Sequence, residues 1–223
     1  MTLTSSRIKY HDIVVSSQAI LGSPLMDPEA LTRIGLDAIV GGARALRLAG
    51  ADTVAFATTQ VNVPIIGLIK TSRVGYEPRI TTTSEEINQL KEAGAQIVAI
   101  DATNRKRPEA LETLFKSAAD NGLEIFADIA TLEEAKQSLD LGATYIATTM
   151  SGYTDARRLT EGPDFELLEG VIALGAKAVL EGRVSTSAHI QQALDLGAHS
   201  VVIGRAITSP QTILRGILEG VKK

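Results

Sequence analysis

The chain has 223 residues, 44% of them hydrophobic, and a formal net charge of −4 at pH 7. This composition suffices for a large core, and the acidic balance argues against the basic surface of a nucleic-acid-binding protein. The absence of cysteine excludes disulfides, thiolate catalysis and sulfur-ligated metals. The first residues, MTLTSSRIKYHD, lack the apolar run of a signal peptide, and no segment approaches the roughly 20 apolar residues of a membrane span, so we expect a soluble, cytoplasmic protein.

Eight short apolar segments along the chain are typical of strands buried on both faces. In chain order they are DIVVSSQ from Asp12, GGARALRL from Gly41, VPIIGLIK from Val63, AGAQIVAID from Ala93, LEIFAD from Leu123, LGATYIATT from Leu141, LGAKAVLEG from Leu174 and LGAHSVVIG from Leu196. Five of them follow a small, glycine-containing pair, which indicates a helix ending at glycine and a strand beginning at once.

Helical segments separate these strands. Ser84–Gly94 has Ser84 as its expected N-cap and glutamate in the first turn, and Thr131–Gly142 ends in glycine. Eight strands alternating with helices predict an α/β fold, a single (β/α)₈ TIM barrel. No linker divides the chain, so we expect one domain over residues 1–223.

The position of the second strand required a choice, because GADTVAFATT, residues 50–59, also looks like a strand. A strand there would leave about ten residues before Val63, too few for a right-handed crossover helix. We therefore predict a strand at Arg44–Leu48 and a helix at Ala51–Gln60.

Polar residues occupy the carboxyl ends of the predicted strands, where barrels of this class carry their chemistry. A single polar residue could simply mark where the chain meets water, but a complete ring indicates an active site. In strand order the ring contains Gln18, Arg47, Lys70, Asp101, Asp128, Thr148 with Thr149, Glu181, and Gly204 with Arg205.

The three histidines are poor candidates for catalysis, because His11, His189 and His199 are expected to face the opposite rim. Proton transfer therefore falls to lysine and carboxylates. The carboxylates of the ring could hold Mg²⁺, but Lys70 and Arg47 beside them oppose a cation, so we expect no metal.

Two loops have the features of a phosphate site. EGRVSTS, with Gly182 and Arg183, and IGRAITSPQ, with Gly204 and Arg205, each place glycine where backbone must approach a ligand closely, and each leads into a helix. Two well-capped helices after tight turns would give the same pattern.

The ordered segments PIIGLIK, YEPRITTTSEEINQL, IVAIDATNRKRP, TTMSGYT, LEGRVST and VVIGRAITSPQ resemble the N-acetylmannosamine-6-phosphate 2-epimerase family. The resemblance runs from VVSSQA to the final helix. It implies a (β/α)₈ barrel, a homodimer, and conversion of the phosphosugar N-acetylmannosamine 6-phosphate to N-acetylglucosamine 6-phosphate in sialic-acid catabolism, without a metal or redox cofactor.

The resemblance assigns a role to particular residues. The catalytic lysine falls on Lys70 and its partner carboxylate on Glu181, while substrate-binding groups fall on Gln18, Arg47 and Asp128. We expect Lys70 to move the C2 proton and Glu181 to move the ring-opening or O1 proton, and a two-base arrangement stays open.

The SGYT loop is the remaining expected contact to the sugar. Its residues Ser151, Gly152 and Tyr153 are expected to lie over the sugar or its acetamido arm, although a purely structural role for Tyr153 is equally compatible with the sequence.

The sequence departs from the family pattern near its end. Many members have arginine after AIT, where this chain has Ser209, and a small residue after the glycine of the last strand, where it has Arg205. Two alternatives therefore stay open: an epimerase or isomerase of a different phosphorylated sugar, and a barrel that binds a phosphosugar without catalysis.

Overall fold

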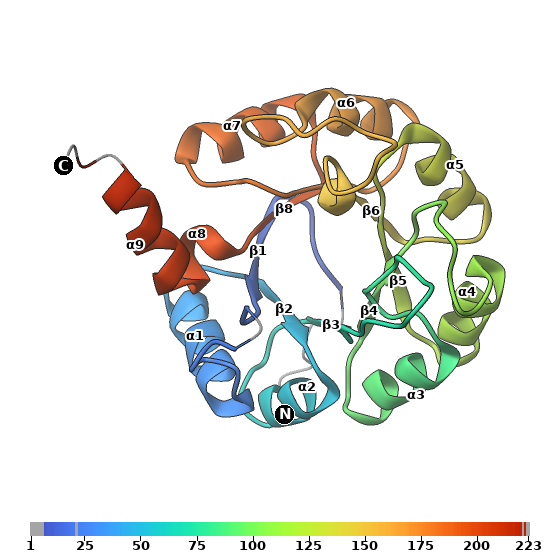
Figure 1. Ribbon diagram of the computed structural model, residues 1–223, viewed down its shortest axis with the longest axis horizontal. Coiled ribbons are helices and arrows are strands. Elements are labelled where there is room, and N and C mark those ends of the chain that lie inside the picture. The colour runs from blue at the N-terminus through green and yellow to red at the C-terminus, as the bar shows by residue number, and fades with distance from the viewer. Residues whose placement is uncertain (1–6, 21, 220, 222–223) are drawn as a thin grey trace.

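The computed structural model describes residues 7–20, 22–219 and 221, and the other positions of the expected 1–223 domain lie outside the described residues. Eight parallel strands close a barrel in the order β1 to β8, and helices surround it (Figure 1). The strands are β1 (Asp12–Ser17), β2 (Ala45–Ala49), β3 (Ile65–Leu68), β4 (Ile97–Asp101), β5 (Glu124–Asp128), β6 (Tyr145–Ala147), β7 (Ala178–Glu181) and β8 (Ser200–Ile203).

The helices alternate with these strands. They are α1 (Pro28–Val40), α2 (Ala51–Thr58), α3 (Ser84–Glu92), α4 (Leu111–Asp120), α5 (Leu132–Asp140), α6 (Phe165–Ala173), α7 (Ser187–Leu196), α8 (Arg205–Thr208) and α9 (Pro210–Glu219), with a 3₁₀ turn η1 (Thr148–Met150) after β6. The predicted (β/α)₈ barrel is confirmed. No helix in the described ranges is long and apolar enough to cross a membrane.

The choice made for the second strand is also confirmed. β2 begins one residue after the predicted start, and α2 begins at Ala51 despite the β-branched residues that follow. Gly50 makes this possible, because it turns the chain from strand to helix with a φ of 97°, which favours glycine.

One predicted helix cap was wrong by a residue. Thr83, not Ser84, is the N-cap of α3, and it forms a capping box with Glu86. The hydroxyl of Ser84 instead donates a hydrogen bond of 2.6 Å to Glu109. The Ser84 hydroxyl is therefore occupied by a residue beyond the helix, while the adjacent Thr83 hydroxyl caps α3.

The core has two layers that follow from strand alternation. The inside of the barrel is filled by strand residues such as Ile66, Phe126 and Val179. A second cluster lies between strands and helices and includes Leu46 of β2 and Leu90 of α3. Arg47 therefore lies on the inner face of β2, between two leucines that face the helices.

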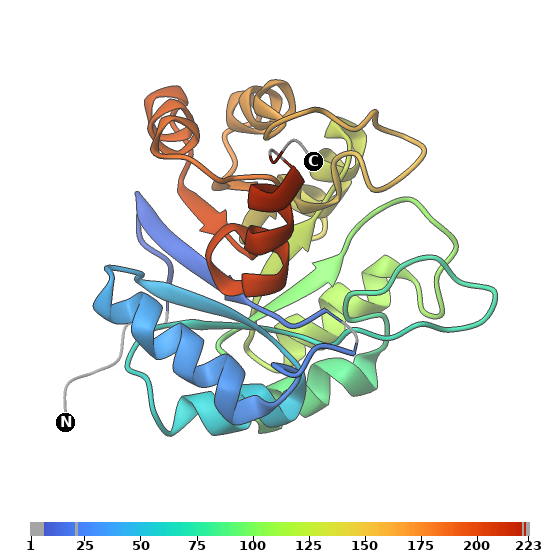
Figure 2. The same ribbon diagram turned by 60° about the vertical axis from the view of Figure 1, so that its left-hand side comes forward.

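Long loops gather at the carboxyl ends of the strands. Figure 2 shows the β3–α3, β4–α4 and β6–α6 loops projecting on the same side of the barrel. This is the side on which the ring of polar residues was predicted.

Gly67 provides a test of the packing between β3 and its helices. A Cβ at this position would lie 2.9 Å from Cδ2 of Leu90 and 3.1 Å from Cβ of Ala95. Gly67→Ala should lower the free energy of unfolding by about 1–3 kcal/mol through overpacking, as measured by urea denaturation. At Gly162 a Cβ would meet only the His189 ring, at 3.8 Å, so Gly162→Ala should stay within about 0.5 kcal/mol of the wild type. Equal stabilities for the two variants would contradict this account.

Candidate active site

A buried ion cluster lies inside the barrel at the carboxyl ends of the strands. Nη2 of Arg47, from β2, lies 2.6 Å from Oδ2 of Asp128 at the end of β5, and Nη1 lies 2.9 Å from Oε1 of Glu181 at the end of β7. The guanidinium also lies over the Phe126 ring, 5.6 Å from its centroid. Two carboxylates from strands separated only by β6 are thus neutralised in part by one cation from β2.

Two buried polar atoms of this cluster have no partner within the described part of the chain. They are Nε of Arg47 and Oε2 of Glu181, a donor and an acceptor. Buried polar groups are normally satisfied, so these two atoms are suited to hydrogen bonding with the hydroxyls or carbonyl of a ligand.

Lys70 lies two residues after the end of β3, on the same inward-facing register as Ile66 and Leu68. Its backbone is fixed by an isolated antiparallel bridge to Ile80, at the returning end of the β3–α3 loop. Its side chain is exposed to a cavity, and no hydrogen bond or ion pair to its ammonium occurs among the described residues. The structure thus leaves this amine free to react.

The electrostatic environment moves the pKa of Lys70 toward neutrality. Desolvation by the surrounding barrel wall is the largest cause of the lowered pKa, and the charge of Arg47 lowers it further, whereas the carboxylate of Glu181 raises it. A larger fraction of this lysine is therefore neutral at physiological pH than of an ordinary one.

The carboxylates shift in the opposite direction. Burial raises the pKa of Asp128 to about 7, against the opposing effect of Arg47. Burial likewise raises the pKa of Glu181. Asp128 is fully buried and its Oδ1 accepts a hydrogen bond of 2.5 Å from Thr149. It lies beneath the cavity and acts on the cavity wall through Arg47 and Thr149.

The cavity has a volume of about 780 Å³ and opens at the carboxyl ends of the strands. Its wall contains most of the predicted site: Gln18, Arg47, Lys70, Thr149, Tyr153, Glu181, Gly182, Arg183, Gly204 and Arg205. Gln18 donates a hydrogen bond of 2.7 Å to the hydroxyl of Ser16, which also lines the cavity and which sequence reasoning missed.

The two glycine loops lie on one side of this cavity. Gly182 has a φ of 110°, a conformation that favours glycine, and Gly204 precedes α8. Arg205 is exposed in the wall and donates a hydrogen bond of 3.0 Å to the Tyr153 hydroxyl. This side of the cavity therefore carries the positive charge of Arg205 and exposes the backbone of the two glycines.

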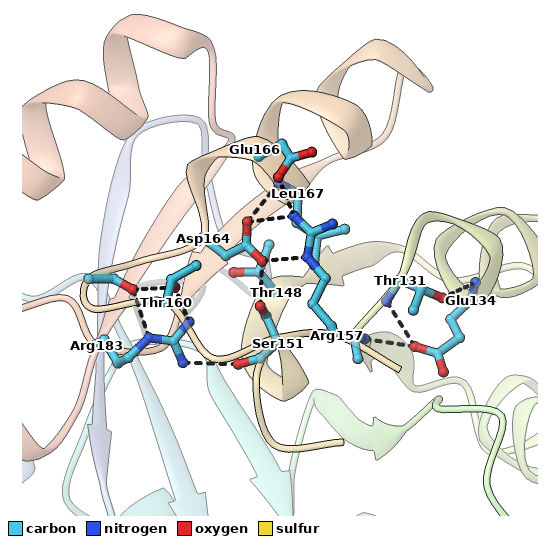
Figure 3. A network of polar contacts seen from close by, with 12 residues as sticks. Thr131, Glu134, Thr148, Ser151, Arg157, Thr160, Asp164, Glu166, Leu167 and Arg183 are labelled. Carbon is cyan, nitrogen blue, oxygen red and sulfur yellow. Dashed lines mark hydrogen bonds and ion pairs between the residues drawn. The ribbon is translucent and has the colours of Figure 1, made fainter. Parts of the chain in front are cut away.

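Arg183 has other partners. Its Nε, Nη1 and Nη2 donate to the carbonyl of Gly162, the carbonyl of Ser151 and the hydroxyl of Thr160, at 2.7, 2.9 and 2.9 Å (Figure 3). These bonds occupy three of the five N–H groups of a guanidinium. Arg183 thus braces the loop between β6 and α6.

The SGYT residues take different positions in that loop. Tyr153 lines the cavity, whereas Ser151 is buried and its hydroxyl points to Asp164 (Figure 3). Gly152 has a φ of 79°, and a Cβ there would lie 2.7 Å from Cα of Leu159. Ser151 and Gly152 therefore do not line the cavity. They determine the path of the loop, Ser151 through its hydrogen bond to Asp164 and Gly152 through its close contact with Leu159.

Asp101 of the predicted ring and His189, which was predicted to lie away from it, differ from expectation. Asp101 is not among the lining residues and is paired with Arg105 at 2.8 Å. His189 does not face the opposite rim. It lies in the first turn of α7, where its Nδ1 accepts from the backbone of Ser185, because a helix following a strand begins on the active side. It does not line the cavity.

Comparison with known proteins identifies the family. The family described as "Putative N-acetylmannosamine-6-phosphate epimerase" matches residues 31–223. A relative of the same designation from Caldanaerobacter subterraneus subsp. tengcongensis is 39% identical over 216 residues, which cover 95% of this chain and 91% of the relative. The chain belongs to the N-acetylmannosamine-6-phosphate epimerase family.

Solved structures agree with this assignment to the epimerase family. The N-acetylmannosamine-6-phosphate 2-epimerase from Clostridium perfringens superposes with a TM-score of 0.93 at 35% identity, covering 96% of this chain and 95% of that chain. A tryptophan synthase alpha-subunit from Pyrococcus furiosus superposes with a TM-score of 0.66 at 16% identity over 91% of each chain, which shows the shared barrel fold alone.

No group of three or more histidine, cysteine, aspartate or glutamate residues in the described ranges is placed to hold a metal ion. The two carboxylates that face each other are already paired with Arg47.

The charges around Lys70 make its pKa adjustable in a known direction. Glu181→Gln removes a carboxylate that raises the Lys70 pKa, so the pKa should fall further below its ordinary value of 10.5. Arg205→Gln removes a cation that lowers it, so the pKa should rise. Both shifts can be followed by the pH dependence of Lys70 acetylation, read by mass spectrometry. An identical Lys70 pKa in the three proteins would show that these charges do not act on it.

Proposed function

We propose that this protein interconverts N-acetylmannosamine 6-phosphate and N-acetylglucosamine 6-phosphate by moving a proton at C2. The observation that carries the proposal is the Lys70 amine in the cavity wall. It pairs with none of the described residues, and it lies close enough to the Arg47–Asp128–Glu181 cluster for those charges to shift its pKa. Family membership supports the substrate, and the site supports the reaction type.

The reaction begins with ring opening, which exposes the C1 aldehyde and acidifies the C2 proton. Glu181 is the group proposed to accept the O1 proton, because its Oε2 has no partner among the described residues and its raised pKa makes it a stronger base than an ordinary glutamate. The ring oxygen takes up a proton from solvent as the C1–O5 bond breaks, and Glu181 holds the proton released from O1.

Neutral Lys70 then takes the C2 proton, and the electron pair of the C–H bond moves into a C1–C2 double bond to give an enolate. Negative charge develops on O1, where Arg47 and Gln18 are placed in the wall as donors. Return of a proton to the opposite face of C2 gives the epimer. We assign the first transfer to Lys70, and a second group completes the exchange if one lysine does not reach both faces.

The phosphate is proposed to bind at the cationic side of the cavity. Gly182 and Gly204 offer backbone N–H groups there, and Arg205 offers a guanidinium. Ser209 serves another purpose: it is buried, and its hydroxyl accepts a hydrogen bond from the backbone of Thr212 in the first turn of α9. Arg205 therefore supplies the positive charge for the phosphate that Ser209 lacks. Arg183 contributes to phosphate binding indirectly, by bracing the β6–α6 loop.

The sugar is proposed to lie between Lys70 and the β6–α6 loop. Tyr153 faces it across the cavity, and Ser151 and Gly152 determine where Tyr153 stands. Asp128 acts indirectly by holding the Arg47 guanidinium in position.

We also propose that the protein works as a homodimer in the cytoplasm, in the breakdown of sialic acid. Support for assembly comes from α9, whose apolar residues Leu214, Ile217 and Leu218 are 57%, 64% and 58% exposed. Exposed apolar surface of this kind marks an interface more often than free surface.

The reaction is tested by proton NMR with N-acetylmannosamine 6-phosphate in D₂O. Formation of N-acetylglucosamine 6-phosphate with deuterium at C2 is the expected outcome. Turnover of another phosphorylated sugar alone would favour the alternative substrate, and ligand-induced thermal stabilisation without turnover would favour a binding protein.

Lys70→Ala should reduce kcat by at least 10²-fold, because loss of a positioned acid–base group typically costs 10²–10⁴-fold. The measurement is the rate of C2 deuteration, with circular dichroism to verify the fold. Lys116→Ala provides a matched control, since Lys116 pairs with Asp120 on the exposed face of α4. Turnover near the wild-type rate in Lys70→Ala would refute the assignment.

A further inference from the structure

The carboxylate of Asp164 holds both ends of the β6–α6 loop, residues 151–164 (Figure 3). Its Oδ2 accepts from the Ser151 hydroxyl at 2.5 Å, at the start of the loop. Arg157, within the loop, forms a two-point ion pair with it at 2.8 and 2.9 Å. Its Oδ1 also accepts from the backbone of Leu167, so Asp164 is at the same time the N-cap of α6.

Ser151 is held from a second direction as well. Its carbonyl accepts from Nη1 of Arg183, while its hydroxyl donates to Asp164, so one buried residue is fixed at the backbone and at the side chain (Figure 3). The loop therefore leaves η1 from a rigid point.

Tyr153 follows Ser151 by two residues and depends on this rigid point. Its side chain is 47% exposed, so burial does not hold it in place. The Arg183 guanidinium lies over its ring, 5.8 Å from the centroid, and its hydroxyl accepts from Nη2 of Arg205 at 3.0 Å. Tyr153 thus joins the β6–α6 loop to the end of β8 across the cavity.

We propose that Asp164 is a positioning residue for anion recognition: by pinning Ser151 and Arg157 it places Tyr153, and Tyr153 orients Arg205 toward the anionic end of the substrate. This inference rests on the proposed function, since it assigns a further determinant of the same site. Asp164 itself lies outside the cavity wall and does not touch the substrate.

The number of donors around Asp164 exceeds what a helix cap requires. A cap needs one accepting oxygen for a backbone N–H, whereas this carboxylate receives a hydroxyl and two guanidinium N–H groups in addition. The Arg157 and Ser151 bonds outweigh burial and hold the pKa of Asp164 at about 2, so it stays ionised through the physiological range. Because asparagine is also a good N-cap, Asp164→Asn removes the ion pair while keeping the cap.

Steady-state kinetics on N-acetylmannosamine 6-phosphate with Asp164→Asn test the proposal. KM should rise roughly tenfold, equivalent to ~1.4 kcal/mol of lost binding, with kcat changed by less than about threefold, the pattern of lost uniform binding. For unphosphorylated N-acetylmannosamine, kcat/KM should stay unchanged. Equal losses for both sugars, or a fall in kcat alone, would overturn the proposal.

Further variants separate positioning from folding. Ser151→Ala keeps the ion pair and the cap and should raise KM in the same direction, which provides the test if Asp164→Asn does not fold. Glu166→Gln is the matched control, because Glu166 also pairs with Arg157 but its side chain is 87% exposed. It should leave KM at the wild-type value.

A double-mutant cycle tests the route through Tyr153. Tyr153→Phe should raise KM like Asp164→Asn, and the double variant should not exceed the larger single effect, because both changes release the same arginine. Additive effects would mean that Asp164 acts by another route and would refute the proposal.

Failure of the proposed function is recognised separately. If the wild type does not turn over the sugar, calorimetry with inorganic phosphate replaces kinetics. Weaker phosphate binding by Asp164→Asn than by Glu166→Gln would then support the positioning role, and equal binding would refute it.

Discussion

The ion pairs of Arg47 are the interaction on which the site depends. Burying Asp128 and Glu181 at the end of a closed barrel would be strongly unfavourable without a cation between them. Arg47 can reach both only because it lies on the inner face of β2, opposite Ser16 of β1 and Ile66 of β3 in the parallel register. A shift of β2 by one residue would turn the guanidinium toward the helices and leave two carboxylates unpaired.

The same cluster explains how Lys70 and Glu181 in the cavity wall, and Asp128 beneath it, acquire useful proton affinities. Burial alone would raise the pKa of both carboxyl groups and lower that of Lys70, and each charge then moderates its neighbours. Arg47 lowers the pKa of all three groups. These shifts bring the pKa values of the two carboxyl groups and of Lys70 closer together, as a proton exchange between carbon and oxygen requires.

Much of this arrangement could be predicted from the sequence because strand patterns are local. The polar residues that end short apolar runs locate Lys70 and Glu181 without any knowledge of distant contacts. What the sequence could not show depends on long-range geometry. Asp164 precedes a helix and looks like an ordinary cap, and nothing local reveals that it also binds Ser151, 13 positions away. His189 was placed on the wrong rim because it was assigned to a helix without knowing where that helix begins. It lies in the first turn of α7, which is at the active side.

The site thus divides into parts of different rigidity. The groups proposed for proton transfer lie on strands that pair with both neighbours in the barrel or, for Lys70, just beyond one, so the framework holds them. The side proposed to bind the anion depends on α8, a helix of four residues, and on a loop held by a few buried hydrogen bonds. Arg205 belongs to this segment and not to the barrel strands. Substrate charge and reaction chemistry can therefore vary independently in this fold, because different structural elements determine each of them.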